Sequence, residues 1–265
     1  MTLRFDLEAH FGPRFFPDLI DAVLSAGSEA RAIAERGFTT EFKADRSPVT
    51  EADQRVESRI RAFLSEHAKN AAIFGEEEGM SGDESTGLVF HVDPIDGTRA
   101  FLRGLPSWSI LIGLEKDRVP VFGLAYFPAD DDLYTAALGH GAYRNGRPLR
   151  VSKVEKLEHA AISHGGLQQF TEWGDFGILE RLANHTFTAR GYADFDGYRQ
   201  LLLGRVDAMI DPCVKSYDIC AAAILVREAG GRFTDLRGVE SIHEGSGLAT
   251  SGPIHDEILR VIRGE

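Results

Sequence analysis

The sequence contains very little cysteine: only Cys213 and Cys220 occur in 265 residues, and they do not form a CxxC pair. Two cysteines cannot build the disulfide framework of a small secreted domain, and no CxxC pair suggests structural zinc. Long hydrophobic runs are also lacking, since no segment approaches the ~20 apolar residues of a membrane-spanning helix. Residues 1–17 carry charges without an apolar core, unlike a secretory signal. We therefore expect free thiols and a cytoplasmic protein without a membrane partner.

Basic residues are in deficit. The chain has 29 Lys and Arg against 41 Asp and Glu, a formal net charge of −12. Binding to nucleic acid or to an anionic membrane needs a basic surface, so this balance argues against both partners. The hydrophobic fraction of 43% and the charged fraction of 26% are typical of a globular protein. The length predicts one domain over residues 1–265, with two packed halves of about 1–150 and 151–265.

Helical and strand patterns alternate along the chain. Apolar residues recur at helical spacing in four segments, namely 17–37, 50–67 with Thr50 as N-cap, 218–229, and a final segment with Pro253 at the first helical position. Apolar or β-branched runs predict five strands, at about 71–75, 88–92, 108–114, 119–127 and 206–210. The polar segment 37–49 predicts a surface loop. This alternation favours a layered α/β architecture over an all-α or all-β fold.

Acidic residues follow two predicted strands and begin one predicted helix. The most informative segment reads Asp93-Pro94-Ile95-Asp96-Gly97-Thr98. Proline fixes φ and glycine permits close backbone approach, so this turn can direct Asp93, the Ile95 carbonyl and Asp96 toward one point. Such oxygen ligands suit Mg²⁺, which binds through carboxylates, waters and substrate phosphate.

Each acidic cluster also has an ordinary explanation. The run Gly75–Gly79, which contains Glu76, can be a solvated loop, and Asp93–Thr98 can be an acidic turn. Asp218 can be a stabilising acid in the first turn of a helix. The joint occurrence of the three clusters, each at a strand end or a helix start, is much more specific than any one of them.

Together these segments resemble the signatures of the inositol monophosphatase superfamily. The resemblance rests on Glu76 in GEEEG, on DPIDGT at 93–98, and on Tyr217-Asp218 followed by AAAILVREAGG. The segment 47–53, SPVTEAD, resembles a further acidic segment of that superfamily. Within it, residues 190–195 resemble the GYxDF segment of histidinol-phosphate phosphatases of the inositol-monophosphatase type. Tyr217 and Ala100 replace a usual Trp and Asn, which bears on pocket shape because neither is a metal ligand by the motif.

The resemblance implies an αβαβα sandwich of the inositol monophosphatase and fructose-1,6-bisphosphatase type, and Mg²⁺-dependent hydrolysis of a small phosphate monoester. Carried over by position, Glu76, Asp93 and the Ile95 carbonyl would hold the first ion. Asp93, Asp96 and Asp218 would hold the second, and a weaker third ion is expected between Glu76 and the substrate phosphate. The resemblance also implies a homodimer.

The same carry-over assigns the attacking water and the phosphate. Asp53 and Thr98 would orient the water, and Thr98 with Glu76 would hold it in line. Backbone N–H groups of Gly97 and Thr98 would bind the phosphate if a helix starts there. No serine, cysteine or histidine nucleophile is needed.

The resemblance places a substrate-contacting carboxylate at Asp211. Histidinol phosphate carries an amine that is usually protonated, so Asp211 with Asp194 would suit it. Asp196 is equally well explained as a residue of a solvated loop. Arg190 is a further candidate for substrate binding, because Arg190 and Arg199 could supply the charge that a nucleotide substrate requires.

Several alternatives stay open at this point. Inositol-1-phosphate and a 3′(2′),5′-bisphosphate nucleotide are rival substrates, although no aromatic shelf for a base is evident. A non-catalytic scaffold is disfavoured because Glu76, Asp93, Asp96 and Asp218 are all present. An EF-hand fails because DPIDGTRAFLRG has no glutamate at its twelfth position.

Overall fold

The computed structural model describes residues 4–43 and 47–265. Within these residues the first half of the chain forms an eight-stranded sheet. Its strands, in order across the sheet, are β10 (Arg147–Pro148), β9 (Gly141–Arg144), β8 (Asp132–Ala137), β7 (Val119–Phe127), β6 (Ser109–Lys116), β5 (Leu88–Asp96), β3 (Ala72–Gly75) and β4 (Gly79–Ser81). Strands β3 and β5 are parallel, and the other neighbours are antiparallel. The helices of this half are α1 (Leu7–Phe11), α2 (Phe15–Arg36), α3 (Glu51–His67) and α4 (Thr98–Leu102).

The second half forms a five-stranded sheet among the described residues. The strand order is β12 (Thr188–Arg190), β11 (Ala161–His164), β13 (Ala208–Pro212), β15 (Ser246–Thr250) and β14 (Arg232–Thr234). Its helices are α5 (Leu167–Trp173), α6 (Gly177–His185), α7 (Asp194–Leu202), α8 (Ser216–Glu228) and α9 (His255–Arg263).

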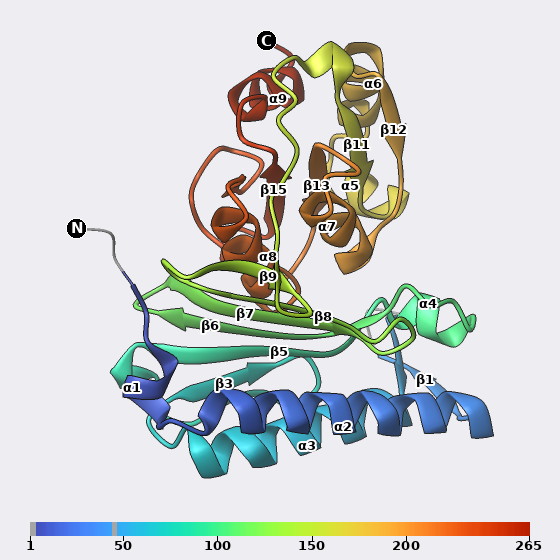
Figure 1. Ribbon diagram of the computed structural model, residues 1–265. Coiled ribbons are helices and arrows are strands. Elements are labelled where there is room, and N and C mark those ends of the chain that lie inside the picture. The colour runs from blue at the N-terminus through green and yellow to red at the C-terminus, as the bar shows by residue number, and fades with distance from the viewer. Residues whose placement is uncertain (1–3, 44–46) are drawn as a thin grey trace.

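The two sheets and their helices stack as five layers (Figure 1). Helices α2 and α3 cover the outer face of the large sheet, and their apolar side chains share one core with it. Helices α7 and α8 fill the space between the sheets, where a second core lies. A third core joins the small sheet to α6 and α9. The αβαβα sandwich expected from the sequence is therefore confirmed.

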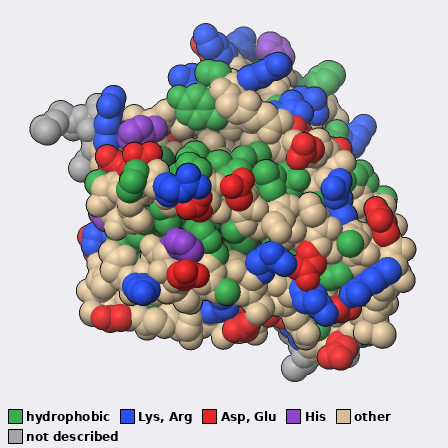
Figure 2. Space-filling model, turned by 60° about the horizontal axis from the view of Figure 1, so that its bottom comes forward, with side chains coloured by type: hydrophobic (Ala, Val, Ile, Leu, Met, Phe, Trp, Pro, Cys, Tyr) green, Lys and Arg blue, Asp and Glu red, His purple; other side chains and the backbone are tan. Residues whose placement is uncertain are grey.

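Figure 2 turns the α2–α3 side toward the viewer. Charged side chains of both signs are interspersed on this face, and hydrophobic side chains gather in one area of it. No helix in the described part of the chain has the length and apolar character needed to cross a membrane.

Most predicted elements are confirmed, with three differences. Strand β5 continues through the acidic turn to Asp96, because this turn still pairs with β6 at Ser109. Pro253 is not the first helical residue: α9 begins at His255, after Ile254 as N-cap. The segment 37–49 is not simply a loop, since β1 (Thr40–Phe42) and β2 (Pro48–Thr50) pair antiparallel within the described residues; residues 44–46 lie outside them.

Close contact between α8 and the large sheet joins the two halves. Gly113 of β6 and Gly123 of β7 face this helix, whose residues Cys220 to Val226 are all buried. A Cβ on Gly123 would lie 2.6 Å from Ile224 Cγ2 and 2.7 Å from the Ala221 carbonyl oxygen. One on Gly113 would lie 2.5 Å from Cys220 Cβ. Only glycine leaves room for the helix at these positions.

We expect Gly123→Ala to lower the free energy of unfolding by about 1–3 kcal/mol, because the new methyl group overlaps helix backbone that cannot move aside. Urea and thermal unfolding measure the change. The matched control is Gly177→Ala, where the methyl group would meet only the ends of the Arg181 and Asp175 side chains. Equal stability of the two variants would contradict this account of the interface.

Candidate active site

One cavity of about 160 Å³ collects the acidic residues that the sequence singled out. It lies where the end of β5, the start of α4, the end of β13 and the start of α8 meet. Six carboxylates line it: Glu76, Asp93, Asp96, Asp194, Asp211 and Asp218. Ile95, Gly97 and Thr98 line it as well. The fold therefore brings residues from both halves of the chain to one place.

The end of β5 fixes the two central carboxylates. Asp93 Oδ1 accepts the Ile95 N–H at 3.1 Å. Asp96 Oδ2 accepts the Ser109 hydroxyl at 3.1 Å and the Phe195 N–H at 2.9 Å. Both aspartates are buried, and burial together with neighbouring carboxylates raises their pKa values well above the usual range. Hydrogen bonds thus hold these groups in an environment that disfavours their charge.

The glycine of the acidic turn is required by its conformation. Gly97 has φ of +79°, and a Cβ there would lie 3.0 Å from the Ser107 carbonyl oxygen. Helix α4 begins directly after it, at Thr98. This meets the condition under which the N–H groups of Gly97 and Thr98 were expected to bind phosphate. The Thr98 hydroxyl donates to the Ile95 carbonyl at 3.0 Å. This turn presents Thr98 to the cavity with its hydroxyl oriented by the backbone.

Asp53 lies next to Thr98, and hydrogen bonds at the start of α3 fix its side chain. Thr50 is the N-cap, with its hydroxyl accepting the Ala52 N–H and donating to Asp53 Oδ2 at 2.6 Å. Asp53 Oδ2 also accepts the Thr50 N–H at 2.8 Å. Its other oxygen lies 3.4 Å from Thr98 Oγ1. Burial raises the Asp53 pKa, and the Thr50 hydrogen bonds oppose that rise.

Glu76 contacts a cation that the sequence did not suggest. The Lys43 ammonium donates to Glu76 Oε1 at 3.0 Å and to Glu77 Oε1 at 2.6 Å. Burial raises the Glu77 pKa to about 7 in spite of Lys43. Lys43 follows β1, in a segment read as loop, so nothing in the sequence placed it beside the GEEEG run.

Asp218 lies in the first turn of α8, as predicted. Its Oδ2 accepts the Lys215 N–H at 2.6 Å, which closes a capping box. Desolvation raises the Asp218 pKa to about 7, and Glu76 and Asp194 add to the rise.

The predicted substrate-binding residues separate into two groups. Asp211 is buried at the end of β13, 3.4 Å from the Tyr198 hydroxyl, and its pKa is raised well above the usual range, chiefly by burial. Asp194 is exposed at the rim of the cavity and begins α7. Arg190 is exposed, donates to the Ala189 carbonyl, and does not line the cavity. Asp196 belongs to α7 rather than to a loop, and accepts a hydrogen bond from Gln200.

Arg99, Gln169 and Val214 line the cavity and were missed by the sequence reading. Ser47 and Pro48 also line it; they belong to the segment 47–53 that the sequence singled out, although neither was predicted as a site residue. Arg99 directly follows the acidic turn, so its position was the signal that could have identified it. Gln169 comes from α5, and no local pattern connects that helix to the turn.

The donor chemistry of the cavity fits a magnesium site. Among the described residues, no three His, Cys, Asp or Glu side chains already form a closed metal-coordinating group. Mg²⁺ does not need such a cage, because it keeps several waters and uses one or two carboxylates plus substrate phosphate. The donors here are carboxylate and carbonyl oxygens, and burial, together with repulsion between neighbouring carboxylates, raises the pKa values of Asp93 and Asp96. A divalent cation would relieve that repulsion.

Comparison with known proteins agrees with this geometry. The model of the inositol monophosphatase family matches residues 18–264. The chain belongs to the inositol monophosphatase family. A member from Mycobacterium tuberculosis named histidinol-phosphatase is 42% identical, covering 82% of this chain and 85% of its own length. A histidinol-phosphatase from Streptomyces coelicolor is 35% identical over 93% of this chain and 97% of its own length. The solved structure of the extragenic suppressor protein suhB from Bartonella henselae has a TM-score of 0.87 at 26% identity, covering 95% of this chain and 99% of that one.

The charge of the cavity predicts a pH-dependent stability for the metal-free protein. A carboxyl whose folded pKa is raised contributes stability below its unfolded pKa and loses it as pH rises through the folded value, which is about 7 for Asp218. We expect a lower Tm at about pH 8 than at about pH 6.5, and a larger increase on adding Mg²⁺ at the higher pH. His255, whose pKa burial lowers to about 4, stays neutral across this window.

Thermal unfolding in metal-free buffer measures this effect. The control is Asp218→Asn, which should reduce the Tm difference between the two pH values because it removes one titrating carboxyl. An unchanged difference in that variant would show that other groups cause it.

Proposed function

We propose that the chain is a Mg²⁺-dependent phosphatase that hydrolyses histidinol phosphate to histidinol and phosphate, a step of histidine biosynthesis. The observation that carries the proposal is one cavity lined by six carboxylates at the turn of Gly97 and Thr98. Four of them are the proposed metal ligands, and the other two are Asp194 and Asp211. The names of the 42% and 35% identical relatives support the choice of substrate.

In this proposal the metal ligands are those of the acidic motifs. Glu76, Asp93 and the Ile95 carbonyl would hold one ion, Asp93, Asp96 and Asp218 would hold another, and a third would bind beside Glu76. Two or three Mg²⁺ bound there would supply an activated water and positive charge for the phosphoryl and leaving oxygens. The protein residues supply fixed positions, which matter because the transition state of phosphoryl transfer is loose.

Thr98 positions the attacking water together with Asp53 and Glu76. The Thr98 hydroxyl donates its one proton to the Ile95 carbonyl at 3.0 Å or to Asp53 Oδ1 at 3.4 Å, so its lone pairs are left to accept a hydrogen bond from water. Asp53 helps to orient the Thr98 hydroxyl, because the capping box of α3 holds the Asp53 carboxylate next to it. The N–H groups of Gly97 and Thr98, at the start of α4, face the phosphate.

Substrate choice follows from the electrostatics of Asp211. A buried carboxylate without a cation is unfavourable, and its raised pKa records that cost. An ammonium group on the substrate would favour the ionised form and gain an ion pair at low dielectric. Asp194 at the rim adds a second negative charge. Arg190 is not included in the site.

Two rival substrates fit this cavity less well. The ring of inositol-1-phosphate is neutral and would leave Asp211 without a counter-charge. The second phosphate of a bisphosphate nucleotide would be repelled by Asp194 and Asp211, and Arg99 is the cationic side chain that lines the cavity among the described residues. A cytoplasmic location, which rests on the two cysteines and the charged N-terminal segment, and a homodimer, which rests on the family resemblance, are part of the proposal.

We expect Mg²⁺-dependent phosphate release to be greatest with histidinol phosphate, compared with inositol-1-phosphate and 3′-phosphoadenosine 5′-phosphate. Chelation by EDTA should abolish release, because the carboxylates alone repel the substrate. Asp93→Asn should reduce kcat by at least roughly 100-fold, since Asp93 is proposed to contact two ions. No release from any substrate would contradict the enzyme proposal, whereas a preference for inositol-1-phosphate would contradict only the substrate.

The role of Asp211 is tested by Asp211→Asn. We expect KM for histidinol phosphate to rise by roughly 10-fold or more, because a charge-assisted hydrogen bond is lost. KM for inositol-1-phosphate should change little. Steady-state kinetics on both substrates measure the difference, and equal changes would exclude charge recognition by Asp211.

A further inference from the structure

Helix α3 contains a buried ion pair that the proposed chemistry does not use. Glu57 is fully buried, and Arg61, one turn later, exposes only 9% of its side chain. The Arg61 Nε donates to Glu57 Oε1 at 2.8 Å. A buried ion pair is a weak source of net stability, because both charges lose their hydration. The role of this ion pair is therefore inferred from the backbone groups that Glu57 and Arg61 bind.

The Glu57 carboxylate binds the backbone that directly follows Glu76. Its Oε2 accepts the Glu77 N–H at 2.7 Å, and its Oε1 accepts the Glu78 N–H at 2.9 Å. With Arg61, this makes three donors for one carboxylate. Because two consecutive peptide groups are bound by one rigid side chain, the backbone after Glu76 has a fixed orientation relative to α3.

Arg61 binds β4, the strand that follows this turn. Its Nη1 donates to the Ser81 hydroxyl at 2.8 Å, and its Nη2 donates to the Gly79 carbonyl. The planar guanidinium thus donates three hydrogen bonds, one to Glu57 and one each to Gly79 and Ser81 of β4.

Strand β3 passes so close to this ion pair that only glycine fits at position 75. A Cβ on Gly75 would lie 2.6 Å from Glu57 Cδ and 2.7 Å from Arg61 Nη2. The next residue, Glu76, donates its N–H to the Val92 carbonyl at 3.1 Å. Glu76 is therefore held by β5 on one side and, through the next peptide group, by Glu57 on the other.

We propose that Glu57 and Arg61 are positioning residues that hold the backbone of Glu76 for metal binding. The inference rests on the proposed role of Glu76 as a metal ligand. Residues that orient a ligand from outside the coordination sphere commonly affect metal affinity by about 10- to 100-fold when they are changed. Helix α3 would then serve the site twice, through Asp53 at its first turn and through this ion pair further along.

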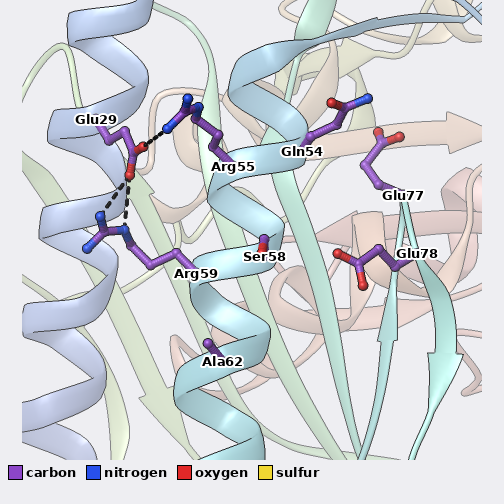
Figure 3. A pocket seen from close by; sticks show the side chains of 8 residues that line it. All are labelled: Glu29, Gln54, Arg55, Ser58, Arg59, Ala62, Glu77 and Glu78. Atoms are coloured by element: carbon purple, nitrogen blue, oxygen red, sulfur yellow. Dashed lines mark hydrogen bonds and ion pairs between the residues drawn. The ribbon is translucent and has the colours of Figure 1, made fainter.

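The same helix provides a matched control. Arg55 and Arg59 lie on its outer side and reach Glu29 of α2 (Figure 3). Arg59 pairs with Glu29 at 2.9 Å, and 46% of its side chain is exposed. It has the same residue type on the same helix as Arg61. Within the described residues it forms no hydrogen bond or ion pair with Glu77 or Glu78, although all three line the pocket drawn in Figure 3.

The test compares Glu57→Gln, Arg61→Lys and the control Arg59→Lys in the full-length chain. Glu57→Gln replaces an accepting oxygen with an NH₂ group that faces other donors, whereas Arg61→Lys keeps the charge and loses the planar fork. Calorimetric titration of the metal-free proteins with Mg²⁺ gives the affinity, and thermal unfolding without Mg²⁺ reports the fold. We expect Mg²⁺ binding to weaken roughly 10- to 100-fold in Glu57→Gln. We expect a smaller loss in Arg61→Lys, and a Kd within about twofold of the unmodified protein in Arg59→Lys.

A purely structural role would lower Tm and leave the Kd of the folded protein unchanged, and that result would overturn the proposal. If Glu57→Gln does not fold, the Mg²⁺ Kd and the Tm of Arg61→Lys test the proposal in the same way. A native chain that binds Mg²⁺ and releases no phosphate would contradict the proposed function, while the Mg²⁺ affinities of the variants would still test the positioning role. A native chain that binds no Mg²⁺ would overturn the positioning role itself.

Discussion

Six carboxylates share one small cavity, and the cost of charging them there decides what the surrounding backbone has to supply. Burial and mutual repulsion raise the pKa values of Asp93, Asp96 and Asp218. Each of these groups is nevertheless fixed by a backbone donor, and two of the donors, the N–H groups of Phe195 and Lys215, come from the second half of the chain. The fold supplies enough hydrogen bonds to orient the carboxylates and too little positive charge to neutralise them. That imbalance is what a binding site for divalent cations requires.

The site consequently depends on the packing of the two halves. The first half contributes Glu76, Asp93 and Asp96, and the second half contributes Asp218 and Asp211. Helix α8 carries Asp218 in its first turn and lies against β6 and β7 where two glycines allow close approach. A change in that contact would shift Asp218 relative to the end of β5. The interface between the halves therefore sets ligand geometry as well as stability.

Local sequence patterns predicted the elements and the acidic turn, and they failed where contacts are long-range. The spacing of apolar residues and the Thr50 cap predicted α3, because both are properties of a single helix. They did not indicate that Glu57 and Arg61 face the β3–β4 turn, since a charged pair four residues apart is usually exposed. Arg190 precedes Asp194 by four residues, yet it does not line the cavity: it ends β12 and donates to the Ala189 carbonyl, whereas Asp194 begins α7.

Charge balance connects the metal region of the cavity to its choice of substrate. Glu76, Asp93, Asp96 and Asp218 carry four negative charges when ionised, and two Mg²⁺ would compensate them. Arg99 partly offsets the charge of Asp194, whereas the charged groups that act most on the Asp211 carboxyl are other carboxylates, Asp194 and Asp218. The phosphate monoester brings further negative charge. A substrate with a cationic group at the end opposite its phosphate would suit this cavity. Its phosphate would lie near the Mg²⁺ ions, and its cation would lie near the remaining carboxylates. A neutral polyol leaves the Asp211 carboxylate buried beside unpaired charge, a cost that its raised pKa already records in the free protein. In the proposed function, the acidic residues of this cavity would thus help to select a phosphorylated amine.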